Sequence, residues 1–125
     1  MPTIRSYEYE YSTSYQGYLS RFSSILLPEV KTTLRRHDDK FDKEISSYIE
    51  TAAEDLKDAG IHISYFLPQS DNWICDSRIL QAVRWYCLSV FGLYNPDMEK
   101  YDKAYRSLKA TLCTQKKYTE NIYAL

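Results

Sequence analysis

Glycine and histidine are scarce in this chain. It has three glycines, four prolines, three cysteines and two histidines in 125 residues. A phosphate-binding loop needs several closely spaced glycines, so the sequence carries no P-loop and no dinucleotide-binding fingerprint. The cysteines are odd in number and widely spaced, which fits neither a disulfide framework nor paired zinc ligands. Neither histidine has a metal-ligand partner at helical spacing, and we expect no metal and no cofactor.

Long apolar runs are also missing. No segment approaches the roughly 18 apolar residues that a transmembrane helix needs. The N-terminus lacks the basic stretch followed by an apolar one that marks a secretory signal. We therefore expect no membrane partner and synthesis in the cytoplasm. A hydrophobic fraction of 44% and a charged fraction of 26% are typical of a single globular domain.

The charge is nearly balanced, with a formal net value of −1. A protein that binds nucleic acid over a broad surface relies on clustered Lys and Arg, which this balance does not favour. Acidic residues outnumber basic ones between residues 25 and 60, and the reverse holds after residue 96. Such an asymmetry could orient one copy against another in an assembly, although solvated helix faces would explain it as well.

Two amphipathic helices are predicted in the second half of the chain. The first follows Asp76 as its cap and ends near Gly92, and its apolar residues recur at three- and four-residue spacing: Ile79, Leu80, Val83, Cys87 and Val90. The second opens with Asn95 as N-cap and Pro96 at the first helical position. Its inner face is Tyr101, Tyr105, Leu108 and Leu112. The short link between them predicts an antiparallel helical hairpin.

Two further helices are predicted upstream. One starts after Leu27, with Pro28 in its first turn, and the other runs from about Phe41 to Ala59. We expect Asp38 or Asp39 to cap the second of these and Gly60 to end it in a left-handed conformation. Residues 61–65 alternate and allow one short strand, while Trp73 and Ile74 are expected to cover the core. The predicted fold class is all-α: a small bundle of four main helices in two antiparallel pairs, with an extended N-terminal arm and a C-terminal tail.

Residues 1–24 differ from the rest, and we define them as a tyrosine-rich N-terminal arm. They hold five tyrosines: Tyr7, Tyr9, Tyr11, Tyr15 and Tyr18. The first three of these alternate with glutamates. Alternation with aromatic residues favours a strand, which must pair with the central segment, a neighbouring copy or a partner. Tyrosine also gives rigid contact area at low entropy cost, so these residues are interface candidates; a disordered leader is the other interpretation. The remaining predicted units are a helical domain over residues 25–113 and a tail over residues 114–125.

Two other functions deserve comparison. A metal-dependent nuclease would need converging carboxylates, and the only dense cluster is Asp38, Asp39, Asp42 and Glu44. These residues straddle a predicted helix start, where capping and the helix dipole explain them, so we predict no enzyme. A small helical DNA-binding regulator would need a polar recognition helix, and the third helix offers only Arg78, Gln81 and Arg84.

The chain also carries an ordered series of motifs. The second half reads Asp76-Ser77-Arg78-Ile79, Ala82-Val83-Arg84-Trp85-Tyr86, Phe91-Gly92-Leu93-Tyr94-Asn95-Pro96-Asp97, Lys100-Tyr101 and Tyr105-Arg106-Ser107-Leu108-Lys109. The first half reads Leu27-Pro28-Glu29-Val30-Lys31, Leu34-Arg35, Asp38-Asp39, Asp42-Lys43-Glu44-Ile45 and Ile49 through Ala53. In this order, from Leu26 to Tyr118, the series resembles the head–tail connector proteins of tailed bacteriophages, also labelled adaptor or DNA-packaging proteins.

The resemblance implies a non-enzymatic structural protein at the head–tail interface of a virion. It implies a ring, commonly of twelve copies, beneath the portal protein, where the ring extends the DNA channel and helps to retain the genome. A downstream stopper or tail-completion protein would join this platform, and DNA would pass without sequence-specific binding. In family members a C-terminal segment reaches the portal, which makes the stretch after Leu112 the docking candidate: Lys116, Lys117, Tyr118, Ile122 and Tyr123.

Overall fold

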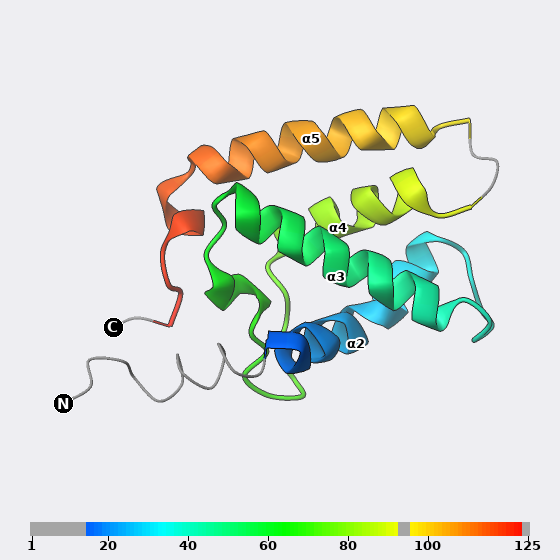
Figure 1. The fold of residues 1–125 in the computed structure, drawn as a ribbon, viewed down its shortest axis with the longest axis horizontal. Coiled ribbons are helices and arrows are strands. Elements are labelled where there is room, and N and C mark those ends of the chain that lie inside the picture. Colours follow the sequence, from blue (N-terminus) through cyan, green and yellow to red (C-terminus); the bar gives the residue numbers. More distant parts are fainter. Residues whose placement is uncertain (1–14, 93–95, 124–125) are drawn as a thin grey trace.

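A computed structural model describes residues 15–92 and 96–123 of the chain. Within these residues the elements are four α-helices and two short 3₁₀ helices: α2 (Tyr15–Thr33), α3 (Asp42–Ala59), η1 (Ile63–Phe66), α4 (Ser77–Val90), α5 (Met98–Thr114) and η2 (Lys116–Thr119). The helices alternate in direction, so α2 pairs with α3 and α4 pairs with α5, and α3 packs on α4 to join the pairs (Figure 1). The predicted all-α bundle is confirmed.

Helix α2 begins earlier than the sequence predicts. The prediction that this helix starts at Pro28 is wrong, because Pro28 lies inside a helix that begins at Tyr15. One stripe of α2 is buried at four-residue and three-residue spacing: Leu19, Phe22, Leu26 and Val30. Pro28 lies on the exposed side, so the carbonyl of Ser24, which loses its helical donor, can be hydrated. The helix therefore runs through residues 24–25, where the sequence suggests the end of the arm.

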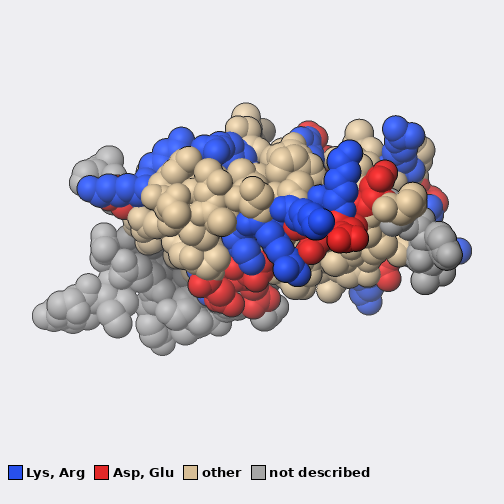
Figure 2. Space-filling model, turned by 90° about the horizontal axis from the view of Figure 1, so that it is seen from above, with Lys and Arg blue, Asp and Glu red and all other residues tan. Residues whose placement is uncertain are grey.

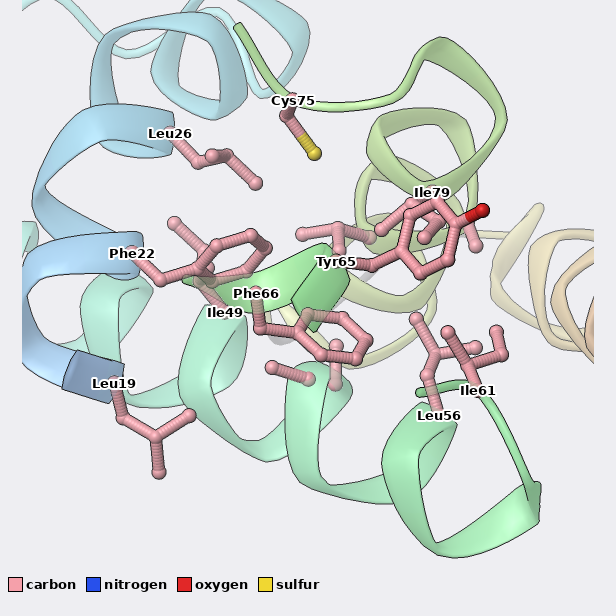
Figure 3. Close-up of a cluster of buried hydrophobic side chains, with 14 of the residues drawn as sticks. Leu19, Phe22, Leu26, Ile49, Leu56, Ile61, Tyr65, Phe66, Cys75 and Ile79 are labelled. Atoms are coloured by element: carbon pink, nitrogen blue, oxygen red, sulfur yellow. The ribbon is translucent and has the colours of Figure 1, made fainter. Parts of the chain in front are cut away.

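The core lies where α2, α3, η1 and α4 meet (Figure 3). Phe22 and Phe66 pack edge to face with ring centroids 5.3 Å apart, and both are almost fully buried. Around them, α3 and α4 contribute aliphatic residues that have no exposed surface: Ile45, Ile49, Leu56, Ile79 and Val83. Cys87 is buried with them, and burial raises the pKa of its thiol to about 12, so it serves as a small apolar core residue.

Helix α3 matches its prediction at one end and departs from it at the other. At its C-terminus Gly60 has φ +125°, and the amides of Gly60 and Ile61 close a Schellman motif on the carbonyls of Lys57 and Leu56. At its N-terminus the prediction that Asp38 or Asp39 caps the helix is wrong. Phe41 precedes the helix without a side-chain cap. The Asp38 carboxylate accepts instead from the amide of Lys40, within the turn.

The segment after α3 forms a 3₁₀ turn rather than the short strand that alternation over residues 61–65 allows. A strand requires a partner, and the structure shows no strand anywhere in its described ranges. His62 caps η1, since its Nδ1 accepts a hydrogen bond from the amide of Ser64. The turn buries Tyr65 and Phe66 on the core.

The second helical pair follows most of its prediction. Asp76 caps α4 as expected, because its Oδ1 accepts from the amides of Arg78 and Ile79. The expected first helical position of Pro96 is wrong, since α5 begins at Met98 after Asp97; the expected N-cap, Asn95, lies outside the described residues. On the predicted inner face of α5, Tyr105 and Leu112 are buried, Leu108 packs on the core and Tyr101 is half-buried.

None of the helices in the described ranges is both long and apolar enough to cross a bilayer.

Candidate functional site

The stretch after α5 is held firmly against the body of the protein. Tyr118 in η2 is only 1% exposed, and its hydroxyl donates to the carboxylate of Asp76, 3.1 and 3.2 Å from the two oxygens. Burial, together with the negative charge of Asp76, raises the pKa of Tyr118 to about 12. Asp76 also caps α4, so one carboxylate joins the start of α4 to the segment that follows α5.

Backbone groups of η2 are fixed as well. The amide of His62 donates to the carbonyl of Tyr118 at 2.8 Å, and the hydroxyl of Tyr65 donates to the carbonyl of Lys117 at 2.7 Å. The rings of Tyr65 and Tyr118 lie 5.1 Å apart. These contacts place η1 and η2 side by side, although more than 50 residues separate them in the chain.

The last described residues continue along η1 and the loop after it. The amide of Ile122 donates to Ser64 Oγ at 3.0 Å. The hydroxyl of Tyr123 donates to the carbonyl of Leu67 at 3.1 Å and accepts from Trp73 Nε1 at 3.0 Å. The backbone is thus held in place, while Ile122 and Tyr123 still expose 43% and 40% of their surface.

One further apolar residue is exposed at this end. Ile74 is 87% exposed, so the prediction that it covers the core is wrong, whereas its neighbour Trp73 packs edge to face on Phe22. Ile74, Ile122 and Tyr123 are the exposed large apolar side chains among the described residues. No periodic pattern surrounds residue 74, so the sequence offered no signal for its exposure. All three lie in segments that are held in place by the contacts between η1, η2 and the loop of residues 69–75.

The family of phage connector proteins has a model that matches residues 26–119 of this chain. The chain belongs to this family. The match covers all four helices except the first part of α2, and it ends at the last residue of η2. No curated protein and no solved structure gives a significant match.

Membership makes the chain a structural connector protein of the phage head–tail interface, one that associates with other head or tail proteins. For this role the relevant features are surfaces that other proteins can contact, rather than a catalytic centre. Of the docking candidates, Lys116 and Lys117 are exposed, Ile122 and Tyr123 are exposed in part, and Tyr118 lies in the core. The structure therefore brings these five residues into one compact segment in which Tyr118 is the anchor.

The arm candidates are described only at their C-terminal end. Tyr7, Tyr9 and Tyr11 lie outside the described residues, as does the side chain of Tyr15. Tyr18 belongs to α2 and is 7% exposed, packed in the core of its own chain. Nearby, Arg21 forms an exposed ion pair of 3.4 Å with Asp71, which connects the start of α2 to the loop of residues 69–75.

Acidic side chains of the cluster at the α2–α3 turn form ion pairs with neighbouring basic side chains. Lys31 lies 2.8 Å from Asp42 and 3.5 Å from Asp39, and the bond to Asp42 raises the pKa of Lys31. Arg36 lies 3.1 Å from Asp38. Across residues 15–92 and 96–123, no group of three or more His, Cys, Asp or Glu side chains is arranged to hold a metal ion.

The arginines of α4 are engaged within the bundle. Arg78 donates to Gln115 at 3.1 Å, and Arg84 pairs with Glu29 at 3.0 Å. Helix α4 itself packs on α2, α3 and α5. These contacts tie helices together, which gives both arginines a structural role.

A polar cluster joins α5 to α3 along an open groove. The Asp55 carboxylate accepts from the Tyr105 hydroxyl at 2.5 Å and from Lys109 Nζ at 2.9 Å. Burial acts to raise the pKa of Asp55, but the hydrogen bonds from Tyr105 and Lys109 outweigh it and the pKa is lowered. Seen from above α5, the surface shows Lys and Arg side chains interspersed with acidic ones, as its ion pairs require (Figure 2).

Proposed function

We propose that this protein forms a ring, of twelve copies in the virion, which sits beneath the portal protein and extends the DNA channel. The ring offers a platform for a downstream stopper or tail-completion protein, and DNA passes through it without sequence-specific binding. The observation that carries this proposal is the family match over residues 26–119. A closed ring of identical subunits needs one face of each copy to fit a different face of its neighbour.

The tail over residues 114–125 is the part that we propose to dock on the portal. Lys116, Lys117, Ile122 and Tyr123 are accessible to a partner, while Tyr118 holds the segment on Asp76. Docking from a segment that is already fixed loses less conformational entropy than docking from a disordered one. Tyr118 therefore contributes by positioning the tail, and the four accessible residues make the contact.

We propose that the tyrosine-rich arm contacts a neighbouring subunit or partner through Tyr7, Tyr9, Tyr11 and Tyr15. Tyr18 takes a different part, since it lies in α2 and its side chain is buried in the core of its own chain. Rapid amide exchange of residues 5–18 within assembled particles would contradict an interface role for the arm.

Binding of the cognate portal protein tests the proposal. Removing residues 114–125 would also remove Tyr118 from the core, so the sharper variant ends at Glu120 and loses only Ile122, Tyr123 and their neighbours. The matched control is Lys43→Ser, an exposed substitution on α3 away from the tail. We expect wild type and control to form a stable complex with the portal by native mass spectrometry, and the shortened chain to lose it. A wild-type chain that stays monomeric and ignores the portal would overturn the proposal.

A further inference from the structure

A groove of about 510 Å³ lies between α3, α4 and α5 and opens to solvent. Most residues along it carry polar groups, and they include Thr51 and Asp55 of α3, Tyr86 and Ser89 of α4, and Arg106 and Lys109 of α5. The contacts within the bundle do not use all the hydrogen-bonding groups of these side chains. The groove is therefore a candidate site for a polar segment that lies outside the bundle.

Two cations on α5 have more hydrogen-bond donors than their partners use. Arg106 Nε lies 3.1 Å from Asp102, which leaves the other N–H donors of the guanidinium. Lys109 Nζ donates to Asp55 at 2.9 Å, and an ammonium has three donors. Tyr86 lines the groove as well, and its hydroxyl has no hydrogen-bond partner within residues 15–92 and 96–123. These groups fit an occupant with carboxylates and aromatic rings.

The groove is not strongly positive, because Asp55 and Asp102 offset its two cations. A bare anion therefore gains little there. An occupant must also make hydrogen bonds to the remaining donors and cover the ring of Tyr86. Tyrosine side chains suit this role, since each one combines an apolar ring with a hydroxyl.

One segment of the chain outside the described residues has this chemistry. The segments not described are residues 1–14, 93–95 and 124–125. Only the first of them carries acidic side chains, and there Glu8 and Glu10 alternate with tyrosines. We infer that this part of the arm, residues 7–11, occupies the groove of a neighbouring copy in the ring. The inference rests on the proposed function and identifies the surface that the arm contacts.

The spacing of the charges agrees with this placement. In an extended chain, alternate residues point to the same side and lie about 7 Å apart. Arg106 and Lys109 are three residues apart on α5, which places their Cβ atoms about 5–6 Å from each other. Glu8 and Glu10 can thus meet one cation each. The tyrosines beside them then point the opposite way, toward the α3 and α4 walls of the groove.

The origin of the arm favours a neighbouring copy over the same chain. The arm leads into α2, which packs on α3 and α4, whereas α5 lies on the opposite side of the bundle (Figure 1). A ring of many subunits joins nearly opposite faces of successive copies, so the α2 side of one copy can meet the α5 side of the next. The fourteen residues before Tyr15 span at most about 50 Å, which is enough to cross such an interface and follow the groove.

Cross-linking tests which segment occupies the groove. Full-length chains, half of them labelled with ¹⁵N, are mixed and assembled on the purified cognate portal protein. A carbodiimide then joins carboxylates directly to the lysine amines that they contact, and mass spectrometry identifies the joined peptides. We expect links from Glu8 or Glu10 to Lys109 that combine a labelled with an unlabelled peptide. A link between Asp55 and Lys109 within one chain serves as the internal control.

Two exposed cations on α5 provide a matched pair of variants. Arg106→Ser removes a groove residue whose side chain is 73% exposed, and Lys103→Ser removes one that is 76% exposed and does not line the groove. Both residues form i,i+4 ion pairs, so circular dichroism and thermal unfolding should stay alike in the two variants. We expect Arg106→Ser to reduce ring assembly on the portal at least about threefold, and Lys103→Ser to leave it unchanged.

The arm supplies the reciprocal variant. A chain with both Glu8→Gln and Glu10→Gln should lose at least as much ring assembly as Arg106→Ser. Adding Arg106→Ser to that chain should cause no further loss, because the partners of the guanidinium are already gone.

Equal ring assembly by Arg106→Ser and wild type, or rings without any link between the arm and Lys109, would overturn the inference while leaving the proposed ring intact. Links found only within one isotopic form would place the arm in the groove of its own chain, and links from portal carboxylates to Lys109 would assign the groove to the portal; either result also overturns the inference. If wild type forms no ring on the portal, the proposed function fails, and this inference with it.

Discussion

Two regions of this bundle are built in opposite ways. The α2–α3 turn, residues 34–41, covers its apolar side chains: Phe41 packs on Phe91 with centroids 5.5 Å apart, and Arg36 stands 4.5 Å over the Phe41 ring. The tail end, formed by residues 61–76 and 115–123, fastens its backbone with hydrogen bonds and leaves Ile74, Ile122 and Tyr123 exposed.

The α2–α3 turn covers its apolar side chains with its own residues, whereas the tail end leaves three apolar side chains exposed to solvent. Exposed ion pairs such as Arg36–Asp38 are stable in water and gain little from a partner. Covering exposed apolar side chains with another surface lowers the free energy. When their backbone is already fixed, the loss of conformational entropy on binding is small. The comparison therefore supports our proposal that this phage connector family member docks through its tail end.

Removing the anchor of the tail should have the largest effect. Tyr118 is 1% exposed, and Tyr118→Ala should lower the free energy of unfolding by about 3–5 kcal/mol, because it empties a core site. Tyr123→Ala, at a residue that is 40% exposed, should lower it by less than about 1 kcal/mol. Urea unfolding measures both. Similar losses in the two variants would show that the tail has no distinct anchor.

The second-largest loss of stability is expected at Asp76, because its carboxylate both caps α4 and accepts a hydrogen bond from Tyr118. Asp76→Ala removes the cap of α4 and the acceptor of the Tyr118 hydroxyl, and should lower the unfolding free energy by about 1–2 kcal/mol. Asp38→Ala in the α2–α3 turn is the matched control, and it should cost less than about 1 kcal/mol since its ion pair is exposed. If the control lost as much as Asp76→Ala, the contrast between the two regions would fail.

Substitutions at two helix C-termini should change the free energy of unfolding by smaller amounts and in opposite directions. Arg35 ends α2 at φ +58°, with its amide bonded to Thr32, while Gly60 ends α3 at φ +125°. A residue with a Cβ is strained in this region. We expect Arg35→Gly to raise the unfolding free energy by about 1 kcal/mol and Gly60→Ala to lower it by about as much. Thermal unfolding would reveal both shifts, and a destabilised Arg35→Gly would instead give the Arg35 side chain a structural role.

The middle of the bundle provides a reference for both regions. Asp55 has a lowered pKa in the folded protein, so its contribution to stability is present above the unfolded-state value of 3.8 and is lost as the pH falls through the folded value. Stability should decline as the pH drops from about 5 to about 3, and Asp55→Asn should make that decline shallower. Chemical unfolding over this range measures it. An unchanged slope in Asp55→Asn would place the acid-sensitive groups elsewhere.

Some of these features follow from local sequence signals. Helix α3 and its end at Gly60 were predictable because the apolar period is regular over the whole helix and a glycine stops it. The cap at Asp76 was predictable because a short polar residue directly precedes an apolar period. Proline, by contrast, suggested a false start for α2, since it is tolerated inside a helix where the freed carbonyl meets water.

The candidate site was predictable only in part. The tail could be selected by its resemblance to connector proteins, but the burial of Tyr118 depends on Asp76, 42 residues away. No local pattern reports a contact over that distance. The exposure of Ile74 was equally hidden, because it depends on how Trp73 and Cys75 on either side of it are buried. Long-range packing, rather than propensity, sets both features.

Electron microscopy of the protein mixed with its cognate portal tests the central claim most directly, because it shows which end of the bundle meets the portal. The account predicts a ring stacked on the portal, with η2, Ile122 and Tyr123 at the contact. A ring that meets the portal through the α2–α3 turn, with Ile122 and Tyr123 facing solvent, would contradict it.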